Sequence, residues 1–278
     1  MKRWACFAFS SPKKRCGMKS PIETNSGRAE MMHALPHHVQ EALNRGPSPP
    51  EMGLTLDHAD ELLNPGYLPM ETGYTRLRNG QMHVACLTKM RGCKGRMVNW
   101  WFGWMEHSEH YQLWHPGDHV WTKWEDGYPG PNNDPDDASY VGYASLVHEY
   151  IGGEMNKLRI HFKDPSAYLD VSRFESCGVG AAICARVGYL DKPVKFAHLI
   201  HFVRDTEDGC EMRSRFWAGD VEIALPVIGS LLGFVANTRA VRSKLATDDL
   251  GRHLVIHCAE EMNHLAMVLP DLFRENTQ

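Results

Sequence analysis

Histidine and glutamate side chains concentrate in one short segment near the C-terminus, between positions 253 and 264. Within it, His257 and Glu261 lie four positions apart, so on a helix they project from one face, one turn from each other. A helical wheel places this pair at the edge of the apolar sector, and places His253 and Glu260 toward solvent. An imidazole and a carboxylate in this arrangement can hold one metal ion. The alternative is an exposed helical ion pair of little energetic consequence.

A second segment, Tyr111 to His119, combines a tyrosine, an aspartate and two histidines. Its Pro-Gly pair predicts a turn, after which His119 opens a strand that runs to Trp124. The tryptophans in and after the segment favour partial burial, whereas an exposed turn with a His/Asp pair is the alternative. The segment is therefore a candidate source of one metal ligand, either His115 or His119.

Two predicted strands each carry a polar side chain among apolar ones. Strand alternation puts Glu149 on one face with Val147 and Ile151, and a carboxylate in such surroundings needs a partner. The alternative is a glutamate at the strand edge with its head group in water. His198 and His201 point to opposite faces of a later strand, so one of them should face inward. A histidine satisfied within the core is the alternative for that residue.

The chain carries none of the established catalytic motifs: no H-E-x-x-H helix, no G-x-S-x-G elbow, no P-loop and no G-x-G-x-x-G turn. Its formal net charge of −4 gives no attraction to nucleic acid or to an anionic membrane. No apolar run approaches the roughly 20 residues of a membrane span, and the N-terminal run is too short for a signal peptide. The eight cysteines form no C-x-x-C pair and are expected to be reduced thiols. We therefore expect a cytoplasmic protein with neither nucleic acid nor a membrane as a partner.

The elements that must position these residues fall into three regions. Residues 1–34 lack a periodic apolar face and are expected to be a disordered N-terminal extension. Residues 35–79 are predicted to be a small N-terminal helical domain, with short helices over 36–43 and 55–63. Residues 80–278 form the main domain. It ends in a long helix from Val241 to about Leu269, with Thr247 as a capping candidate and Gly251 as a candidate joint.

Before that helix, the main domain is dominated by extended segments joined by short turns. These are 81–90, 140–150, 157–162, 178–189, 195–204 and 211–217, with an aromatic patch at 99–105 and a Pro/Gly/Asn/Asp loop at 127–137. Short turns imply antiparallel pairing. We therefore expect an α+β fold, in which a curved antiparallel sheet wraps the long terminal helix around a cavity.

The order and spacing of these features resemble the 2,4-diacetylphloroglucinol hydrolase family, which includes phloretin hydrolase. The resemblance runs from about residue 35 to about residue 273, and is carried by Trp100-Trp101, the Tyr111 to His119 segment, Glu149, His201, and His257 with Glu261. It implies a helix-grip (Bet v 1-like) fold preceded by a small N-terminal domain. It also implies a zinc ion held by two histidines and two glutamates, although iron and manganese tolerate similar ligands.

The resemblance also implies roles for individual residues. The metal ligands would be His119, Glu149, His257 and Glu261, with His115 as the competing choice for the first ligand and a further catalytic candidate. Tyr111 and His201 would line the pocket and hydrogen-bond the substrate. The chain departs from the family pattern at 215–217, where it reads Arg-Phe-Trp and the diacetyl-type enzyme carries a tyrosine. The identity of the substrate is therefore open.

The reaction implied by the resemblance is hydrolysis of the carbon–carbon bond between an acyl group and a polyhydroxylated phenol ring. Water would attack the acyl carbon of the keto tautomer, and the products would be a carboxylic acid and the phenol. The tryptophans at 100, 101 and 104 are candidate pocket walls, or else ordinary core aromatics. Two other functions stay open, a non-catalytic helix-grip protein that binds an apolar ligand and a metal-dependent hydrolase of an ester or β-diketone. The oligomeric state is also open, with a homodimer as one option.

Overall fold

The structure of the chain is a computed structural model that describes residues 32, 34–131, 134, 138–226 and 228–277. Eight strands form one antiparallel sheet in the order β1-β2-β8-β7-β6-β5-β4-β3. Their bounds are β1 Gly73–Arg76, β2 Met82–Arg91, β3 His119–Trp124, β4 Ala144–Ile151, β5 Glu154–Lys163, β6 Val179–Tyr189, β7 Val194–Thr206 and β8 Gly209–Ile223. The predicted antiparallel sheet is confirmed, although the segment predicted at 140–150 is a strand only from Ala144 onward.

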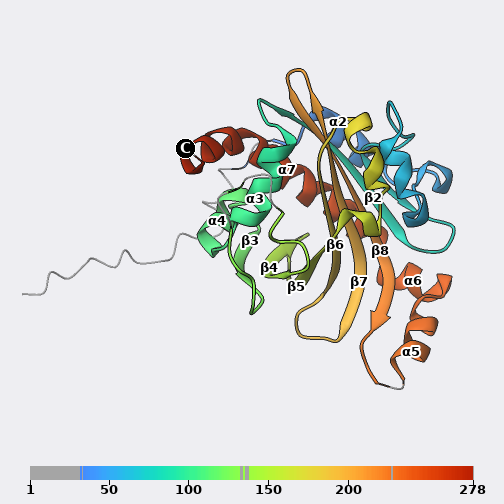
Figure 1. Cartoon of the computed structure of the whole chain (residues 1–278). Coiled ribbons are helices and arrows are strands. Elements are labelled where there is room, and N and C mark those ends of the chain that lie inside the picture. Colours follow the sequence, from blue (N-terminus) through green and yellow to red (C-terminus); the bar gives the residue numbers. More distant parts are fainter. Residues whose placement is uncertain (1–31, 33, 132–133, 135–137, 227, 278) are drawn as a thin grey trace, which may run out of the picture.

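Helix α7, Asp248–Asn276, lies against this sheet (Figure 1). It packs on β1 and β2 and reaches across to β4. Val255, Met262 and Leu265 of the helix are fully buried in the core that it shares with the sheet. Each such side chain contributes about 1.5–3 kcal/mol through burial of apolar surface. A curved antiparallel sheet that holds one long helix is the helix-grip fold, and this expectation is confirmed.

The start of α7 differs from the single helix predicted over 241–269. A short helix α6, Arg239–Leu245, ends first, and α7 begins after Thr247, whose hydroxyl accepts a hydrogen bond from the Leu250 amide at 3.2 Å. The capping role of Thr247 is confirmed, but Gly251 is not the joint. A Cβ atom at Gly251 would lie 2.7 Å from Sδ of Met82, so the glycine allows the helix to approach β2 closely.

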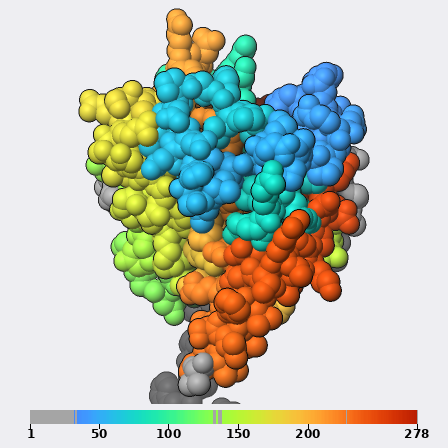
Figure 2. All heavy atoms as spheres, turned by 90° about the vertical axis from the view of Figure 1, so that its right-hand side faces the viewer, coloured from blue at the N-terminus to red at the C-terminus, as the bar shows by residue number. Residues whose placement is uncertain are grey.

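Residues 34–79 form α2 His37–Arg45, the 3-10 helices η1 Pro50–Met52 and η2 Leu56–Leu63, and strand β1. Helix α2 packs against α7. The part over 54–68 instead covers the opposite face of the sheet, and this region appears as blue and cyan spheres in Figure 2. Leu54 and Leu62 pack there with Phe202 and Trp217, whereas Leu199 faces the α7 core. The first predicted helix is confirmed, and the second is a 3-10 helix. The prediction of disorder over 1–34 concerns mainly residues 1–31 and 33, which lie outside the described residues.

Two helices follow β2, in a region that the sequence analysis expected to be dominated by extended segments. The aromatic patch lies on α3, Gly95–Trp104, and is followed by α4, Ser108–Trp114. Three short 3-10 helices, η3 Pro165–Ala167, η4 Val171–Arg173 and η5 Glu175–Cys177, connect β5 to β6, and α5, Gly229–Ala236, follows β8. No helix within the described residues has the length and apolar character that crossing a membrane requires.

Candidate metal centre

The four side chains proposed as ligands converge from three elements on the inner face of the sheet. His119 opens β3 and lies opposite Glu149 of β4 in the strand register, while His257 and Glu261 project from one face of α7. The Nε2 atom of His119 lies 3.5 Å from Oε2 of Glu261 and 3.9 Å from Oε2 of Glu149. The Nε2 atom of His257 lies 3.9 Å from the same Glu261 oxygen. All four side chains are buried, so they form a compact group shielded from solvent.

The second ring nitrogen of His119 fixes which nitrogen carries the proton. Nδ1 lies 2.9 Å from the backbone oxygen of Tyr111, which can only accept a hydrogen bond, so Nδ1 carries the proton. Nε2 then presents a lone pair, and this atom is buried without a hydrogen-bond partner. A buried polar atom without a partner is costly. A metal ion between this lone pair and the two carboxylates would remove that cost.

His257 is oriented in the same way by a neighbouring carboxylate. Its Nδ1 atom donates to Oδ2 of Asp118 at 3.0 Å, which leaves Nε2 directed toward Glu261. Histidines that bind metals almost always donate their other ring N–H to a carboxylate or a backbone carbonyl. His257 and His119 show these two arrangements, and their ligand atoms lie within 4.8 Å of each other and of Glu261. This set of residues could therefore hold a metal ion.

In His115 the two ring nitrogens have the opposite roles from those in His119. Its Nδ1 accepts a hydrogen bond from the Asp118 amide at 2.9 Å, so the proton of the neutral ring lies on Nε2. That Nε2 lies 3.4 Å from Glu260 and 3.6 Å from the Asp118 carboxylate. His115, Asp118 and His257 also place ligand atoms within 4.8 Å of one another. However, a protonated ring nitrogen cannot coordinate a cation, so the geometry favours His119 over His115.

Tyr111 fixes both Glu149 and His119. Its hydroxyl donates a hydrogen bond to Oε2 of Glu149, and its ring stacks on the His119 ring with centroids 3.7 Å apart and planes 5° from parallel. Burial raises the pKa of Tyr111 well above its usual value, and the Glu149 carboxylate adds to this effect. The phenol therefore stays protonated and holds Glu149 in place.

The cluster holds more negative charge than its surroundings compensate. Burial raises the pKa of Glu261 to about 8, even though His257 acts to lower it, and Glu149 contributes further to the rise. For His257, burial acts to lower the pKa, but the hydrogen bond to Asp118 and the nearby carboxylates outweigh it and raise the pKa to about 9. Near neutral pH the group therefore retains protons that a divalent cation would displace. The residues present fit a cation.

A cavity of about 240 Å³ opens beside this cluster, between the sheet and α7. Glu149, His257 and Glu261 line it, together with Tyr111 and His201. His201 is the inward-facing histidine of β7. Its Nδ1 atom lies 2.7 Å from the Ser214 hydroxyl, and burial lowers its pKa to about 3, so the ring is neutral at neutral pH. An uncharged imidazole here can exchange hydrogen bonds with a polar ligand.

The aromatic wall of the cavity differs from the predicted one. Its lining includes Phe102 and Trp114, together with Phe216 of the Arg-Phe-Trp stretch, but none of the tryptophans at 100, 101 and 104. Trp101 is fully buried, Trp104 stacks on Trp100, and the Trp104 ring also contacts Trp101 at a tilt of 40°. They are therefore core aromatics, because α3 turns them away from the cavity.

Two side chains that support the site were not singled out from the sequence. Asp118 lies in the turn before β3 and orients His257, which is 139 positions away along the chain. Ser214 of β8 lies opposite His201 of β7 in the sheet register. The available signal for Asp118 was its position next to the predicted ligand His119. Ser214 could have been found only by pairing the two strands in the correct register.

The model of the DAPG hydrolase PhiG domain matches residues 54–274, which is most of the chain. The chain belongs to this family. The resemblance predicted from the sequence, from about residue 35 to about residue 273, is confirmed.

Curated relatives agree with this assignment. The 2,4-diacetylphloroglucinol hydrolase of Pseudomonas protegens is 27% identical over 264 residues, covering 89% of this chain and 82% of the relative. The phloretin hydrolase of Eubacterium ramulus is 25% identical over 254 residues, covering 84% of this chain and 82% of the relative. The match therefore extends over nearly the whole of both proteins.

Solved structures match at lower similarity. A START superfamily protein from Mycobacterium smegmatis covers 68% of this chain and 99% of its own, with a TM-score of 0.38 and 12% identity. The Zhui aromatase/cyclase from Streptomyces sp. R1128 covers 71% and 96%, with a TM-score of 0.33 and 13% identity.

Proposed function

We propose that the protein is a metal-dependent hydrolase that cleaves the carbon–carbon bond between an acyl group and a polyhydroxylated phenol ring. The family assignment and the names of the two curated hydrolases support the reaction class. The converging imidazoles and carboxylates support the metal dependence. The substrate is an acylphenol, and the products are a carboxylic acid and the deacylated phenol.

The metal ligands in this proposal are His119, Glu149, His257 and Glu261. Two imidazole nitrogens and two carboxylate oxygens suit zinc, while iron and manganese accept similar ligands. A bound metal ion of this kind polarises an acyl oxygen or activates water near neutral pH. Asp118 and the Tyr111 backbone oxygen orient the two imidazoles, and the Tyr111 hydroxyl orients Glu149.

The chemical step requires water to add to the acyl carbon of the keto tautomer, in which the acylated ring carbon already bears a hydrogen. The bond between the acyl carbon and the ring then breaks, and the ring leaves as the enolate of a phenol, which takes up the proton released by the water. His201 is placed to hold a ring hydroxyl through the nitrogen that Ser214 does not engage. The Tyr111 hydroxyl donates to Glu149, so its oxygen is left to accept a hydrogen bond from the substrate. General acid–base assistance of this kind is typically worth about 10²–10⁴-fold.

One observation carries the proposal: the unprotonated Nε2 atom of His119 is buried without a hydrogen-bond partner and faces the carboxylates of Glu261 and Glu149. A non-catalytic binder of an apolar ligand has no need for such a group. The test is incubation of the purified protein with phloretin and with monoacetylphloroglucinol, with chromatographic measurement of the released acid. The same assay is repeated after removal of metal with a chelator and after addition of zinc.

We expect acid release, its loss on chelation and its recovery with zinc. Release that persists in metal-free protein would contradict the metal dependence while keeping the reaction. No acid from any acylphenol, together with tight binding of those compounds, would favour the non-catalytic ligand-binding function instead.

A further inference from the structure

The cavity extends well beyond the proposed metal ligands. Leu250, Leu254, His257 and Glu261 all face it from one side of α7. At a rise of 1.5 Å per residue, this stretch of helix spans about 16 Å. His257 and Glu261 lie at the inner part, and Leu250 lies about 10 Å from His257 along the helix axis. The site therefore has room for a ligand much longer than a phenol ring with a short acyl group.

The outer part of the cavity has a different chemical character from the inner part. Its walls are apolar and come from Val187, Val194, Phe196, Val221, Leu245 and Leu254. The carboxylates and imidazoles among the described lining residues are those of Glu149, His201, His257 and Glu261, and Asn156 lies opposite Glu149 in the strand register. Tyr189, which stacks on Phe196, adds a hydroxyl to the outer part. A polyhydroxylated ring therefore finds most of its hydrogen-bond partners in the inner part. An apolar group is favoured in the outer part, because it removes apolar wall from water.

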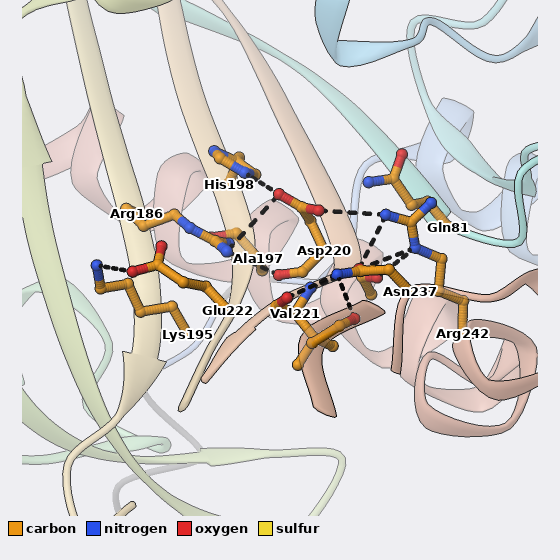
Figure 3. Close-up of polar contacts among 12 residues, drawn as sticks. Gln81, Arg186, Lys195, Ala197, His198, Asp220, Val221, Glu222, Asn237 and Arg242 are labelled. Atoms are coloured by element: carbon orange, nitrogen blue, oxygen red, sulfur yellow. Dashed lines mark hydrogen bonds and ion pairs between the residues drawn. The ribbon is translucent and has the colours of Figure 1, made fainter. Parts of the chain in front are cut away.

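The outer wall is held in place by polar contacts outside the cavity (Figure 3). Arg242 of α6 donates to the Gly219 backbone oxygen at 2.8 Å and pairs with Asp220 at 3.2 Å. Asn237 forms two hydrogen bonds with the backbone of Val221, at 2.9 and 2.7 Å. These contacts fix α5 and α6 to β8, and with them Leu245 at the end of α6. The apolar outer part is therefore formed before any ligand binds.

Building on the proposed function, we infer that the substrate is an acylphenol whose acyl group carries an extended apolar tail. The phenol ring and the acyl carbon occupy the inner part, beside His201 and the proposed metal ligands. The tail runs outward along α7 past Leu254 to Leu250. An acetyl group would leave the outer walls in contact with water, whereas a hexanoyl or octanoyl chain would cover them. Phe216 lies in the stretch where the chain lacks the tyrosine of the diacetyl-type enzyme. It fits this assignment, because it adds apolar surface and no hydroxyl to the cavity lining.

The test uses a series of monoacylphloroglucinols with acetyl, butanoyl, hexanoyl and octanoyl groups. Dissociation constants are measured by calorimetry and kcat/KM by acid release, on the full-length, zinc-loaded protein. We expect both affinity and kcat/KM to rise with chain length, by up to about fourfold for each added methylene. Leu250→Gln should flatten this dependence by placing an amide in the outer part. Met267→Gln is the matched control, because this residue lies on the same helix and is exposed.

The outcomes separate the two proposals. Hydrolysis that is equal for all chain lengths, or fastest for acetyl, would overturn the inference and keep the proposed function. Binding that strengthens with chain length without any acid release would support the ligand class and overturn the proposed function. If Leu250→Gln and Met267→Gln show the same chain-length dependence as the unchanged protein, the tail does not lie along α7 and the inference fails.

Discussion

Two clusters in this protein each hold a largely buried glutamate, but they differ in whether the protein supplies cations to balance its charge. Glu71 accepts hydrogen bonds from Arg213 at 2.6 and 3.1 Å and from Arg215 at 2.6 Å. Burial acts to raise the pKa of Glu71, but the two guanidinium groups outweigh it and hold the pKa below its usual value. At the candidate metal centre the group that opposes the rise is a histidine, His257, and burial still raises the pKa of Glu261 to about 8.

The difference shows how a structural cluster can be told from a binding site. In the Glu71 cluster the protein supplies its own cations, and the carboxylate joins residues 34–79 to β8. At the metal centre two imidazoles and two carboxylates face one another, and their charge is balanced only by protons or by an added cation. The first cluster should therefore matter for stability, and the second for metal binding and activity.

The largest effect is expected for His257→Ala. Loss of one ligand should remove the metal and lower kcat/KM for phloretin by about 1000-fold or more, because a catalytic metal supplies several kcal/mol to the transition state. Steady-state kinetics with zinc in the buffer measures the change. His253→Ala, on the same helix but outside the cavity lining, is the control and should keep most of the activity. Equal activity in both variants would mean that the cluster is not catalytic.

Glu71→Ala should produce the largest loss of stability. It leaves the Arg213 and Arg215 side chains buried without a carboxylate, and breaking a buried ion pair in this way costs about 3–5 kcal/mol. Urea denaturation of the metal-free protein measures the free energy of unfolding. The matched control is Glu61→Ala, since the Glu61 side chain is half exposed. A loss below about 1 kcal/mol would show that this cluster does not hold the two parts together.

A smaller effect is expected for Asp118→Asn, which weakens the hydrogen bond that orients His257. The zinc affinity should fall by about 10–100-fold, as for other residues that orient metal-bound histidines. Competition with a chromogenic chelator gives the dissociation constant. Asp126→Asn is the control, because the Asp126 side chain is almost fully exposed. An unchanged zinc affinity in Asp118→Asn would place His257 outside the metal centre.

The smallest expected effect is a gain in stability, whereas Glu71→Ala should lower stability. The pKa of Glu261 is about 8 in the folded protein and about 4.3 in the unfolded chain. The metal-free folded state therefore loses stability as the pH rises from about 4.3 to about 8, because the unfolded chain ionises this group more easily. Glu261→Gln should therefore raise the Tm of metal-free protein at pH 8 by several degrees, at about 2–4 °C for each kcal/mol. It should have little effect at pH 5. A Tm that falls at pH 8 would mean that Glu261 is already satisfied without a cation.

Strand alternation and helical periodicity gave most of the fold and identified the convergent residues. They placed Glu149 on one face with Val147 and Ile151, His198 and His201 on opposite faces of their strand, and His257 with Glu261 on one face of the terminal helix. In the structure Glu149, His201, His257 and Glu261 all line the cavity. These patterns depend only on local geometry, so they can be read from neighbouring positions. The roles of these residues as ligands and substrate contacts stay predictions, as do the cytoplasmic location and the oligomeric state.

Other features could not be read locally because contacts between distant residues decide them. The aromatic run at 99–105 suits a strand or a helix. In the structure it lies on α3, where Trp101 packs on Trp114 of α4 and Trp100 packs on Phe273 of α7. Gly251 suggested a break in the last helix, but its contact with Met82 explains why a glycine lies there. The choice between His115 and His119 depended on which backbone group each Nδ1 atom meets.

The most direct test of the central claim is the zinc content of the purified protein, measured by mass spectrometry for His119→Ala and His115→Ala beside the unchanged chain. The unchanged protein and His115→Ala should each hold about one zinc per chain, and His119→Ala should hold less than about a tenth, since a site that has lost one of its ligands binds zinc far more weakly. Zinc retained in His119→Ala, or no metal in any of the three proteins, would contradict the account.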